Sequence, residues 1–210
     1  MSSHSVDPIT LEVARHRFAA IAAEMGTVLR RTALSPNIKE RADCSAAVFT
    51  ASGEMLSQAE HIPVHLGSMP ESVAACLARF DPRPGVQYAV NDPFHGGTHL
   101  NDLTLVAPVF VEGEHVAWVA NRAHHADVGG EAPGSMPAHA TTVDQEGHRV
   151  EPMVAVSGGG WRDAFVGPFV SASRTPWERR GDLDAQMGSN AVAVGRLAEL
   201  VEREGLERYR

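Results

Sequence analysis

The chain reads LTLVAPVFV over residues 103–111, EGE over residues 112–114 and HVAWVA over residues 115–120. Two apolar runs joined by a short segment that contains Gly113 predict a β-hairpin. A hairpin needs further strands and covering helices to bury its apolar side chains. The rest of the fold is therefore expected to assemble around these residues.

Strands and helices are expected on both sides of the hairpin. Apolar residues at spacings of three and four predict a helix that starts at Asp7-Pro8 and ends before Ser35-Pro36. Shorter apolar segments, bounded by turn residues, predict further strands. These expected elements are strands at residues 46–50, 54–58 and 86–90 and a helix at 70–80.

The C-terminal half is expected to contain a long ordered loop and a last helix. Residues 128–160 are rich in glycine, proline and polar side chains, which favours a loop. A helix is expected from Pro176 to Glu204, with Thr175 as its N-cap, although three glycines weaken its helical propensity. Together the elements predict an α/β fold, with α+β as the alternative, in which helices flank a mixed or mostly antiparallel sheet.

Composition excludes several classes of protein. With 43% hydrophobic and 21% charged residues, the 210-residue chain is typical of a folded domain. A formal net charge of −8 argues against nucleic acid as a partner. The chain has no apolar run of about 18 residues, so no membrane span is expected. A polar N-terminus and two isolated cysteines, Cys44 and Cys76, favour a cytoplasmic setting and do not indicate a covalent nucleophile.

Histidines and carboxylates gather in two short segments at the ends of expected strands. The first is Asp92-Pro93-Phe94-His95-Gly96-Gly97, closely followed by His99 and Asp102, and the second is His124-His125-Ala126-Asp127-Val128-Gly129-Gly130. Imidazole and carboxylate together suit Mn²⁺, Fe²⁺ or Zn²⁺. If both strands end at one edge of the sheet, Asp92, His95, His124 and Asp127 meet there and leave room for water or substrate. The predicted metal site thus lies on loops at strand ends.

Each segment also has a structural interpretation. An Asp-x-x-His segment in a loop is typical of a turn that the aspartate caps, and a single histidine such as His124 is often structural. Because two similar segments each stand beside paired glycines, the sequence supports metal binding and a structural role equally. Residues 60–65, Glu60-His61-Ile62-Pro63-Val64-His65, form a third and weaker cluster, for which a surface loop is the simpler explanation.

Six segments, in order along nearly the whole chain, resemble one protein family. They are residues 7–13 (DPITLEV), 35–41 (SPNIKER), 58–69 (QAEHIPVHLGSM), 91–102, 122–130 and 174–182. This series is similar to the hydantoinase B/5-oxoprolinase family, which includes the α subunits of acetone and acetophenone carboxylases. Members of this family are much longer, so residues 1–210 are expected to be the N-terminal portion of its domain, without the C-terminal region.

The resemblance implies a division of labour between subunits. A hydantoinase A-type partner binds ATP with Mg²⁺ and phosphorylates a carbonyl or enol oxygen of the substrate, and the B-type subunit contributes a divalent metal site. Lys39 is the chain's single lysine and lies outside any P-loop pattern, so ATP is expected on the partner.

The family's metal ligands imply that role for five residues here and a catalytic role for two more. The implied metal ligands are Asp92, His95, His124, Asp127 and Glu60. The implied catalytic residues are His125, which faces the substrate or supports the ligands, and Asp102. His99 is implied as a further support.

Three functions follow from the resemblance. The first is the B-type subunit of an ATP-dependent amidohydrolase that cleaves a cyclic amide with a divalent Mn, Zn or Fe ion. The second is the α-type subunit of an ATP-dependent ketone carboxylase. The third is a shortened, non-catalytic assembly subunit. A chain without the family's C-terminal region is expected to expose apolar surface, and a separate C-terminal half is then a further expected partner.

Overall fold

The structure is a computed structural model that describes residues 7–60, 65 and 67–209, without the side chains of residues 60 and 208. Its α-helices are α1 (Pro8–Thr32), α2 (Pro36–Lys39), α3 (Met69–Arg79), α4 (Asp163–Ala172), α5 (Pro176–Glu204) and α6 (Leu206–Tyr209). Its strands are β1 (Cys44–Thr50), β2 (Met55–Glu60), β3 (Gln87–Val90), β4 (Asp102–Val111), β5 (Glu114–His124), β6 (Met153–Ser157) and β7 (Gly160–Trp161). Two short 3₁₀ helices are η2 (Pro93–His95) and η3 (Val143–Gln145).

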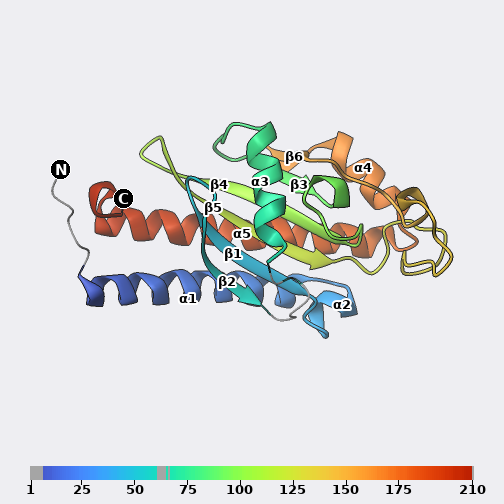
Figure 1. Ribbon diagram of the computed structural model, residues 1–210, viewed down its shortest axis with the longest axis horizontal. Coiled ribbons are helices and arrows are strands. Elements are labelled where there is room, and N and C mark those ends of the chain that lie inside the picture. Colours follow the sequence, from blue (N-terminus) through green and yellow to red (C-terminus); the bar gives the residue numbers. More distant parts are fainter. Residues whose placement is uncertain (1–6, 61–64, 66, 210) are drawn as a thin grey trace.

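The strands form one seven-stranded sheet in the order β2-β1-β5-β4-β3-β6-β7. Every strand pairs with its neighbours in the antiparallel direction. The expected hairpin, β4 and β5, lies near the centre of the sheet, and Figure 1 shows the other strands arranged on either side of it. The predicted fold class, with helices flanking a mostly antiparallel sheet, is confirmed.

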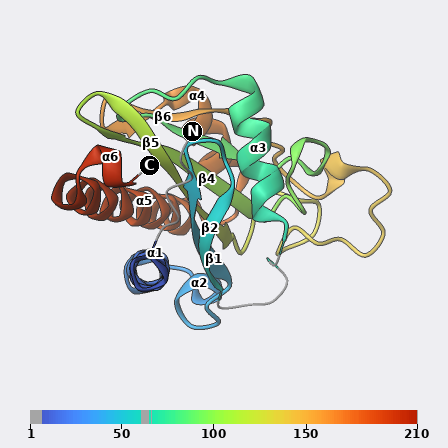
Figure 2. The same cartoon turned by 60° about the vertical axis from the view of Figure 1, so that its left-hand side comes forward.

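Helices cover both faces of this sheet. Alternate side chains of a strand point to opposite faces, and in β1 Val48 packs with α1 and α5 while Phe49 packs with α3. Figure 2 shows α1 and α5 on one side of the strands and α3 on the other. The aromatic side chains of α4 pack with Leu183 of α5 and with residues of β3, β4 and β6. The result is a three-layer arrangement with apolar cores on both faces of the sheet.

The two long helices begin where the sequence predicts. Asp7 caps α1, because its carboxylate accepts a hydrogen bond from the Thr10 N–H at 3.1 Å, and Pro8 fits the first turn, where no N–H is needed. Helix α5 runs from Pro176 to Glu204 as predicted and ends before Gly205, whose φ is +84°. Within the described residues, no helix is both long and apolar enough to cross a membrane.

The expectation of a loop throughout residues 128–160 is wrong at the end of this range, where β6 lies and β7 begins. Residues 153–157 form β6, which pairs with β3 and extends the sheet. The segment MVAVS has the composition of a strand, but proline and glycine on either side of it hid the signal. The remainder of that region is mainly loop, with the single turn of η3.

Candidate metal centre

The candidate site lies where three strands meet at one edge of the sheet. Strand β4 starts at Asp102, β5 ends at His124, and these two residues are paired across the hairpin. Strand β1 starts directly after Asp43, whose carbonyl oxygen accepts a hydrogen bond from the His124 N–H at 3.0 Å. Strand pairing alone therefore brings two carboxylates and an imidazole, from distant parts of the sequence, to one place.

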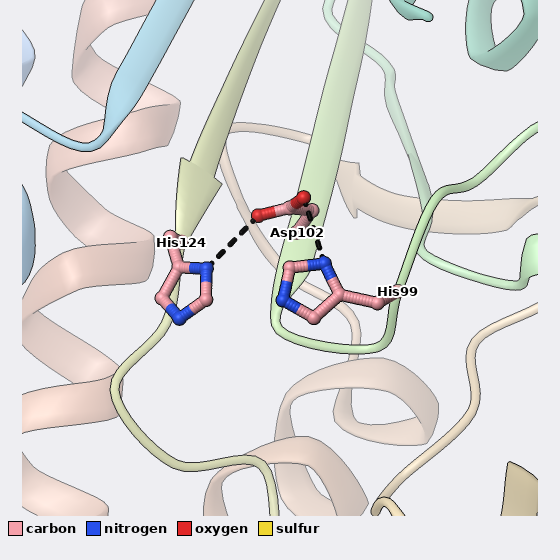
Figure 3. Close-up of side chains that lie close together, drawn as sticks. All are labelled: His99, Asp102 and His124. Carbon is pink, nitrogen blue, oxygen red and sulfur yellow. Dashed lines mark hydrogen bonds and ion pairs between the residues drawn. The ribbon is translucent and has the colours of Figure 1, made fainter. Parts of the chain in front are cut away.

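Asp102 is the centre of this site. Its Oδ1 lies 3.2 Å from Nδ1 of His124, and its Oδ2 lies 2.9 Å from Nδ1 of His99. Figure 3 shows the two imidazole rings approaching the same carboxylate from different segments. Thr98 donates a further hydrogen bond to Oδ2 at 2.9 Å. Both carboxylate oxygens are thus held in a fixed orientation.

A second carboxylate and a third histidine lie beside this group. Asp43 Oδ2 is 3.8 Å from His124 Nδ1. The buried ring of His65 places Nε2 at 3.5 Å from Asp102 Oδ1 and at 3.6 Å from Asp43 Oδ1. Asp43 Oδ1 and His65 Nε2 are both buried and have no hydrogen-bond partner.

The electrostatics of the site favour a charged aspartate. Burial alone would raise the pKa of Asp102, but hydrogen bonds with His124 and His99, together with the nearby imidazole of His65, outweigh burial and hold this pKa well below its usual range. The same hydrogen bond to Asp102 raises the pKa of His99. A carboxylate that stays ionised is what a cation requires.

The donor atoms fit a metal ion. The ligand atoms of His99, Asp102 and His124 all lie within 4.8 Å of one another, and this is the one such group among the residues that the structure describes. The unpartnered Asp43 Oδ1 adds a carboxylate oxygen at the same place. Two imidazole nitrogens with carboxylate oxygens suit Mn²⁺, Fe²⁺ or Zn²⁺. The side chains of His99 and His124 are 32% and 15% exposed, so solvent reaches the group.

Asp92 and His95, two of the predicted ligands, bind each other instead of joining this group. The carboxylate of Asp92 is fully buried, accepts a hydrogen bond from the Phe94 N–H at 2.9 Å, and lies 2.8 Å from Nδ1 of His95. Arg149 approaches the same carboxylate at 3.8 Å. The aspartate caps η2, which is the turn-capping alternative that the sequence allowed.

Asp127, a third predicted ligand, also has other partners. Its carboxylate accepts hydrogen bonds from the N–H groups of Gly129 and Gly134. Arg174 forms an ion pair with it at 2.7 Å. These contacts fix the loop after β5 and leave Asp127 outside the His99–Asp102–His124 group.

His125 does not face the group either. It follows His124 directly, and its fully buried ring contacts Gln186 Oε1 at 2.9 Å and Arg179 at 3.2 Å, both on α5. Burial, reinforced by the Arg179 guanidinium, lowers the pKa of His125 to about 4. It is therefore a neutral histidine in the layer between sheet and helix.

The third cluster lies partly outside the described residues. Glu60 is the last residue of β2 and pairs with Ser45 of β1, but its side chain is outside the description, as are residues 61–64. His65 is described and belongs to the site. The two cysteines are buried and free, and burial raises the pKa of each thiol to about 12, which makes both unsuitable as nucleophiles.

Asp43 was not predicted as part of the site, His99 was predicted only as a support, and His65 was named only in the weaker third cluster. One signal was available, because Asp102 and His124 are equally far from Gly113 and so face each other if the hairpin turns there. This symmetry pairs His99-x-x-Asp102 with His124. For Asp43 and His65, the sequence carries no comparable signal, since their positions depend on how β1 and the segment before α3 pack.

Comparison with known proteins identifies related sequences and folds. The model of the hydantoinase B/oxoprolinase family matches residues 7–210. The 5-oxoprolinase of Dictyostelium discoideum is 38% identical over 204 residues, 96% of this chain and 16% of that protein. The caprolactamase subunit beta of Pseudomonas jessenii is 33% identical over 99% of this chain and 36% of that protein.

Two solved structures share the fold. The crystal structure of the ATP-dependent caprolactamase from P. jessenii superposes with a TM-score of 0.88 at 32% identity, over 97% of this chain and 36% of that chain. A nucleotide-free acetone carboxylase superposes with a TM-score of 0.89 at 21% identity, over 97% of this chain and 27% of that chain. Among these relatives, the chain spans at most 36% of the length of the related protein.

Proposed function

The chain belongs to the hydantoinase B/oxoprolinase family, and from this premise we propose that it carries the metal centre of an ATP-dependent enzyme that hydrolyses a cyclic amide. The observation that carries the proposal is the His99–Asp102–His124 group at the edge of the sheet. Relatives at 33–38% identity are named for lactam substrates, 5-oxoproline and caprolactam, which supports an amide as the substrate class.

The proposed ligands are His99, Asp102 and His124, with Asp43 as a fourth. A divalent Mn, Zn or Fe ion held there would polarise a carbonyl group or lower the pKa of a water molecule. The hydrogen bond to Asp102 raises the pKa of His99. Because a metal ion competes with protons for its ligands, uptake of the ion is expected to release protons.

ATP makes the amide reactive in this proposal. An amide carbonyl resists attack because resonance with nitrogen stabilises it. A partner of the hydantoinase A type transfers the γ-phosphoryl group of ATP to the carbonyl oxygen. Water then adds to the carbon, the C–N bond breaks as nitrogen takes up a proton, and a second water molecule hydrolyses the resulting acyl phosphate to a carboxylate and phosphate. The partner is needed because this chain contains no P-loop and a single lysine, Lys39.

Two further assignments belong to the proposal. We assign the chain to the cytoplasm, since two buried free thiols fit a reducing compartment. We also assign to it the N-terminal portion of a longer family domain, which fits its coverage of 36% of the caprolactamase subunit beta.

The metal centre is tested with two histidines of the same loop. His99 and His95 each lie three residues from an aspartate that they contact, but His99 alone belongs to the proposed centre. We expect near-stoichiometric Mn, Zn or Fe in the purified wild type and in His95→Gln, and its loss in His99→Gln, by elemental analysis with and without an A-type partner. Loss in His95→Gln with retention in His99→Gln would instead support the ligand set of Asp92 and His95.

A ketone carboxylase is the second candidate, and the shared fold with acetone carboxylase favours it. ATP consumption by the complete complex separates the two. Consumption with a lactam supports the hydrolase, whereas consumption that needs both a ketone and bicarbonate rejects it. A chain without metal under every condition would support the non-catalytic assembly subunit.

A further inference from the structure

One histidine near the proposed metal centre is not among its ligands. The ring of His65 is fully buried and lies behind the two carboxylates, with Nε2 at 3.5 Å from Asp102 Oδ1 and 3.6 Å from Asp43 Oδ1. On the other side of the ring, Nδ1 lies 3.1 Å from the hydroxyl of Ser45. The imidazole thus joins the hydroxyl of one strand to two acidic side chains.

These contacts decide which ring nitrogen carries hydrogen. A lone pair on Nε2 would face two negative oxygens, which is repulsive, whereas an Nε2–H group would be attracted to both. Ser45 can satisfy the other nitrogen by donating its hydroxyl hydrogen to Nδ1. The arrangement therefore favours a hydrogen on Nε2, directed between Asp43 and Asp102.

Hydrogen bonds through Ser68 also fix the main chain of His65. Its carbonyl oxygen accepts a hydrogen bond from the Ser68 hydroxyl at 3.3 Å, and that hydroxyl also contacts the buried guanidinium of Arg122. Arg122 donates further hydrogen bonds to Thr104 at 2.9 Å and to Ser72 at 2.7 Å. Arg122 is paired with Ser45 across β1 and β5, so both anchors of His65 belong to the same part of the sheet.

We propose that His65 is a positioning residue that holds the carboxylates of Asp43 and Asp102 together, ready for a metal ion. Two carboxylates that converge on one point repel each other before a cation arrives. A hydrogen-bond donor fixed between them offsets this repulsion and restricts their orientation. Groups that hold metal ligands in this way typically change metal affinity by about 10- to 100-fold when they are removed. The inference rests on the metal centre proposed above.

The test measures metal binding and does not depend on turnover. The full chain is stripped of metal, and the dissociation constant for Zn²⁺ is measured by competition with a coloured chelator. We expect His65→Leu to bind Zn²⁺ about 10- to 100-fold more weakly than wild type. His65→Gln, which can place an amide N–H near the position of Nε2, is expected to recover much of this loss. His139→Gln is the matched control, since His139 is exposed and its ring contacts the exposed carboxylate of Glu131.

Two further measurements separate positioning from packing. The visible spectrum of the Co²⁺-loaded chain reports ligand geometry, and we expect it to change in His65→Leu and to stay the same in His139→Gln. Ser45→Ala removes the partner of Nδ1 and is expected to weaken Zn²⁺ binding by less than His65→Leu does. This second variant keeps the test informative if His65→Leu does not fold.

Each contrary result has a distinct meaning. Wild-type affinity in His65→Leu overturns the positioning role and leaves the metal centre intact. If His65→Leu does not fold, wild-type affinity in Ser45→Ala overturns this role. If His65→Leu and His65→Gln weaken Zn²⁺ binding equally and lose equal stability in the metal-free state, His65 has a packing role. This result also overturns the positioning role. Absence of Zn²⁺ binding in wild type overturns the metal centre, and the role of His65 with it.

Discussion

At the scale of single residues, His124 and His125 are adjacent in sequence and have opposite surroundings. His124 is 15% exposed and contacts Asp102, whereas His125 is fully buried beneath the sheet. Consecutive residues of an extended chain point to opposite faces, so one imidazole is directed to the candidate centre and the other to α5. The same residue type therefore takes two different roles at neighbouring positions.

The buried histidine makes stability depend on pH. The groups that face His125 are Arg179, Asp182 and Gln186 of α5, Phe169 of α4 and His124, the residue before it. The pKa of His125 falls from 6.5 to about 4 on folding, chiefly through burial. Between these values the unfolded chain binds a proton that the folded chain does not bind. The free energy of unfolding is thus expected to decrease as the pH falls from 6.5 to 4, by on the order of 3 kcal/mol.

Urea unfolding of the metal-free chain at pH 7.5, 6 and 5 checks this expectation. Wild type should lose stability over this range more steeply than His125→Gln, which has no proton to bind. His139→Gln, altered at an exposed histidine, should follow wild type. An equal slope for wild type and His125→Gln would contradict the assignment of a neutral, buried His125.

The sequence predicts part of the candidate site. It indicates that histidines and aspartates meet at strand ends, and it names His124 and Asp102 among the residues of interest. It does not indicate that Asp92 caps its own turn, because an Asp-x-x-His segment fits a cap and a ligand pair equally well. It includes His65 only in the weaker third cluster, because the position of this residue follows from packing between distant segments.

At the scale of elements, helix α5 contains three glycines with different surroundings. A Cβ at Gly181 would lie 2.2 Å from Cδ1 and 2.6 Å from Cγ of Leu34, so this glycine allows α5 to approach the segment after α1. A Cβ at Gly188 or Gly195 would meet nothing within 4 Å, and Gly195 is exposed. Only the first glycine is required by packing.

Alanine at two of these positions is expected to act in opposite directions. Gly195→Ala should raise the free energy of unfolding by up to about 1 kcal/mol, because alanine has the higher helix propensity. Gly181→Ala should lower it by about 1–3 kcal/mol, because Leu34 must move. Both values come from urea unfolding monitored by circular dichroism. Stabilisation by Gly181→Ala equal to that by Gly195→Ala would show that Leu34 moves aside without cost.

Most elements were predictable because their signals are local. The caps of α1 and α5, the hairpin turn and the apolar spacing of α3 all lie within a few residues of the element that they define. Strand β6 and helix α4 were not predicted, since β6 is five residues long and α4 contains Pro168. The strand order, with β5 between β1 and β4, depends on long-range pairing that no local pattern indicates.

At the scale of the whole molecule, an apolar groove lies between the first turns of α1 and the end of α5. Ile9, Leu11 and Val13 are 74%, 52% and 43% exposed and line it together with Leu200 and Tyr209. The groove has a volume of about 390 Å³. Exposed apolar surface that is contiguous in this way favours association.

The isolated chain is therefore expected to self-associate as its concentration rises. Burial of a leucine or isoleucine side chain contributes about 1.5–3 kcal/mol, so the double substitution Ile9→Ser/Leu11→Ser should weaken association more than about tenfold. Sedimentation velocity across a wide concentration range measures this effect. Met55→Ser, at an exposed methionine that does not line the groove, is the control. A wild-type chain that stays monomeric throughout would contradict the expectation.

The pairing of Asp102 with His124 across the hairpin limits how the chain can change in length during evolution. One residue added to β4 or β5 shifts their register and turns every following side chain to the opposite face. A residue added to β5 would move His124 to the buried position of His125 and put Ala123 opposite Asp102, whereas a residue removed would put His125 there. Insertions and deletions between Asp102 and His124 are thus expected in pairs or within bulges, such as the one between Val109 and Phe110. Apart from bulges, odd changes in length should be confined to the loops outside this hairpin.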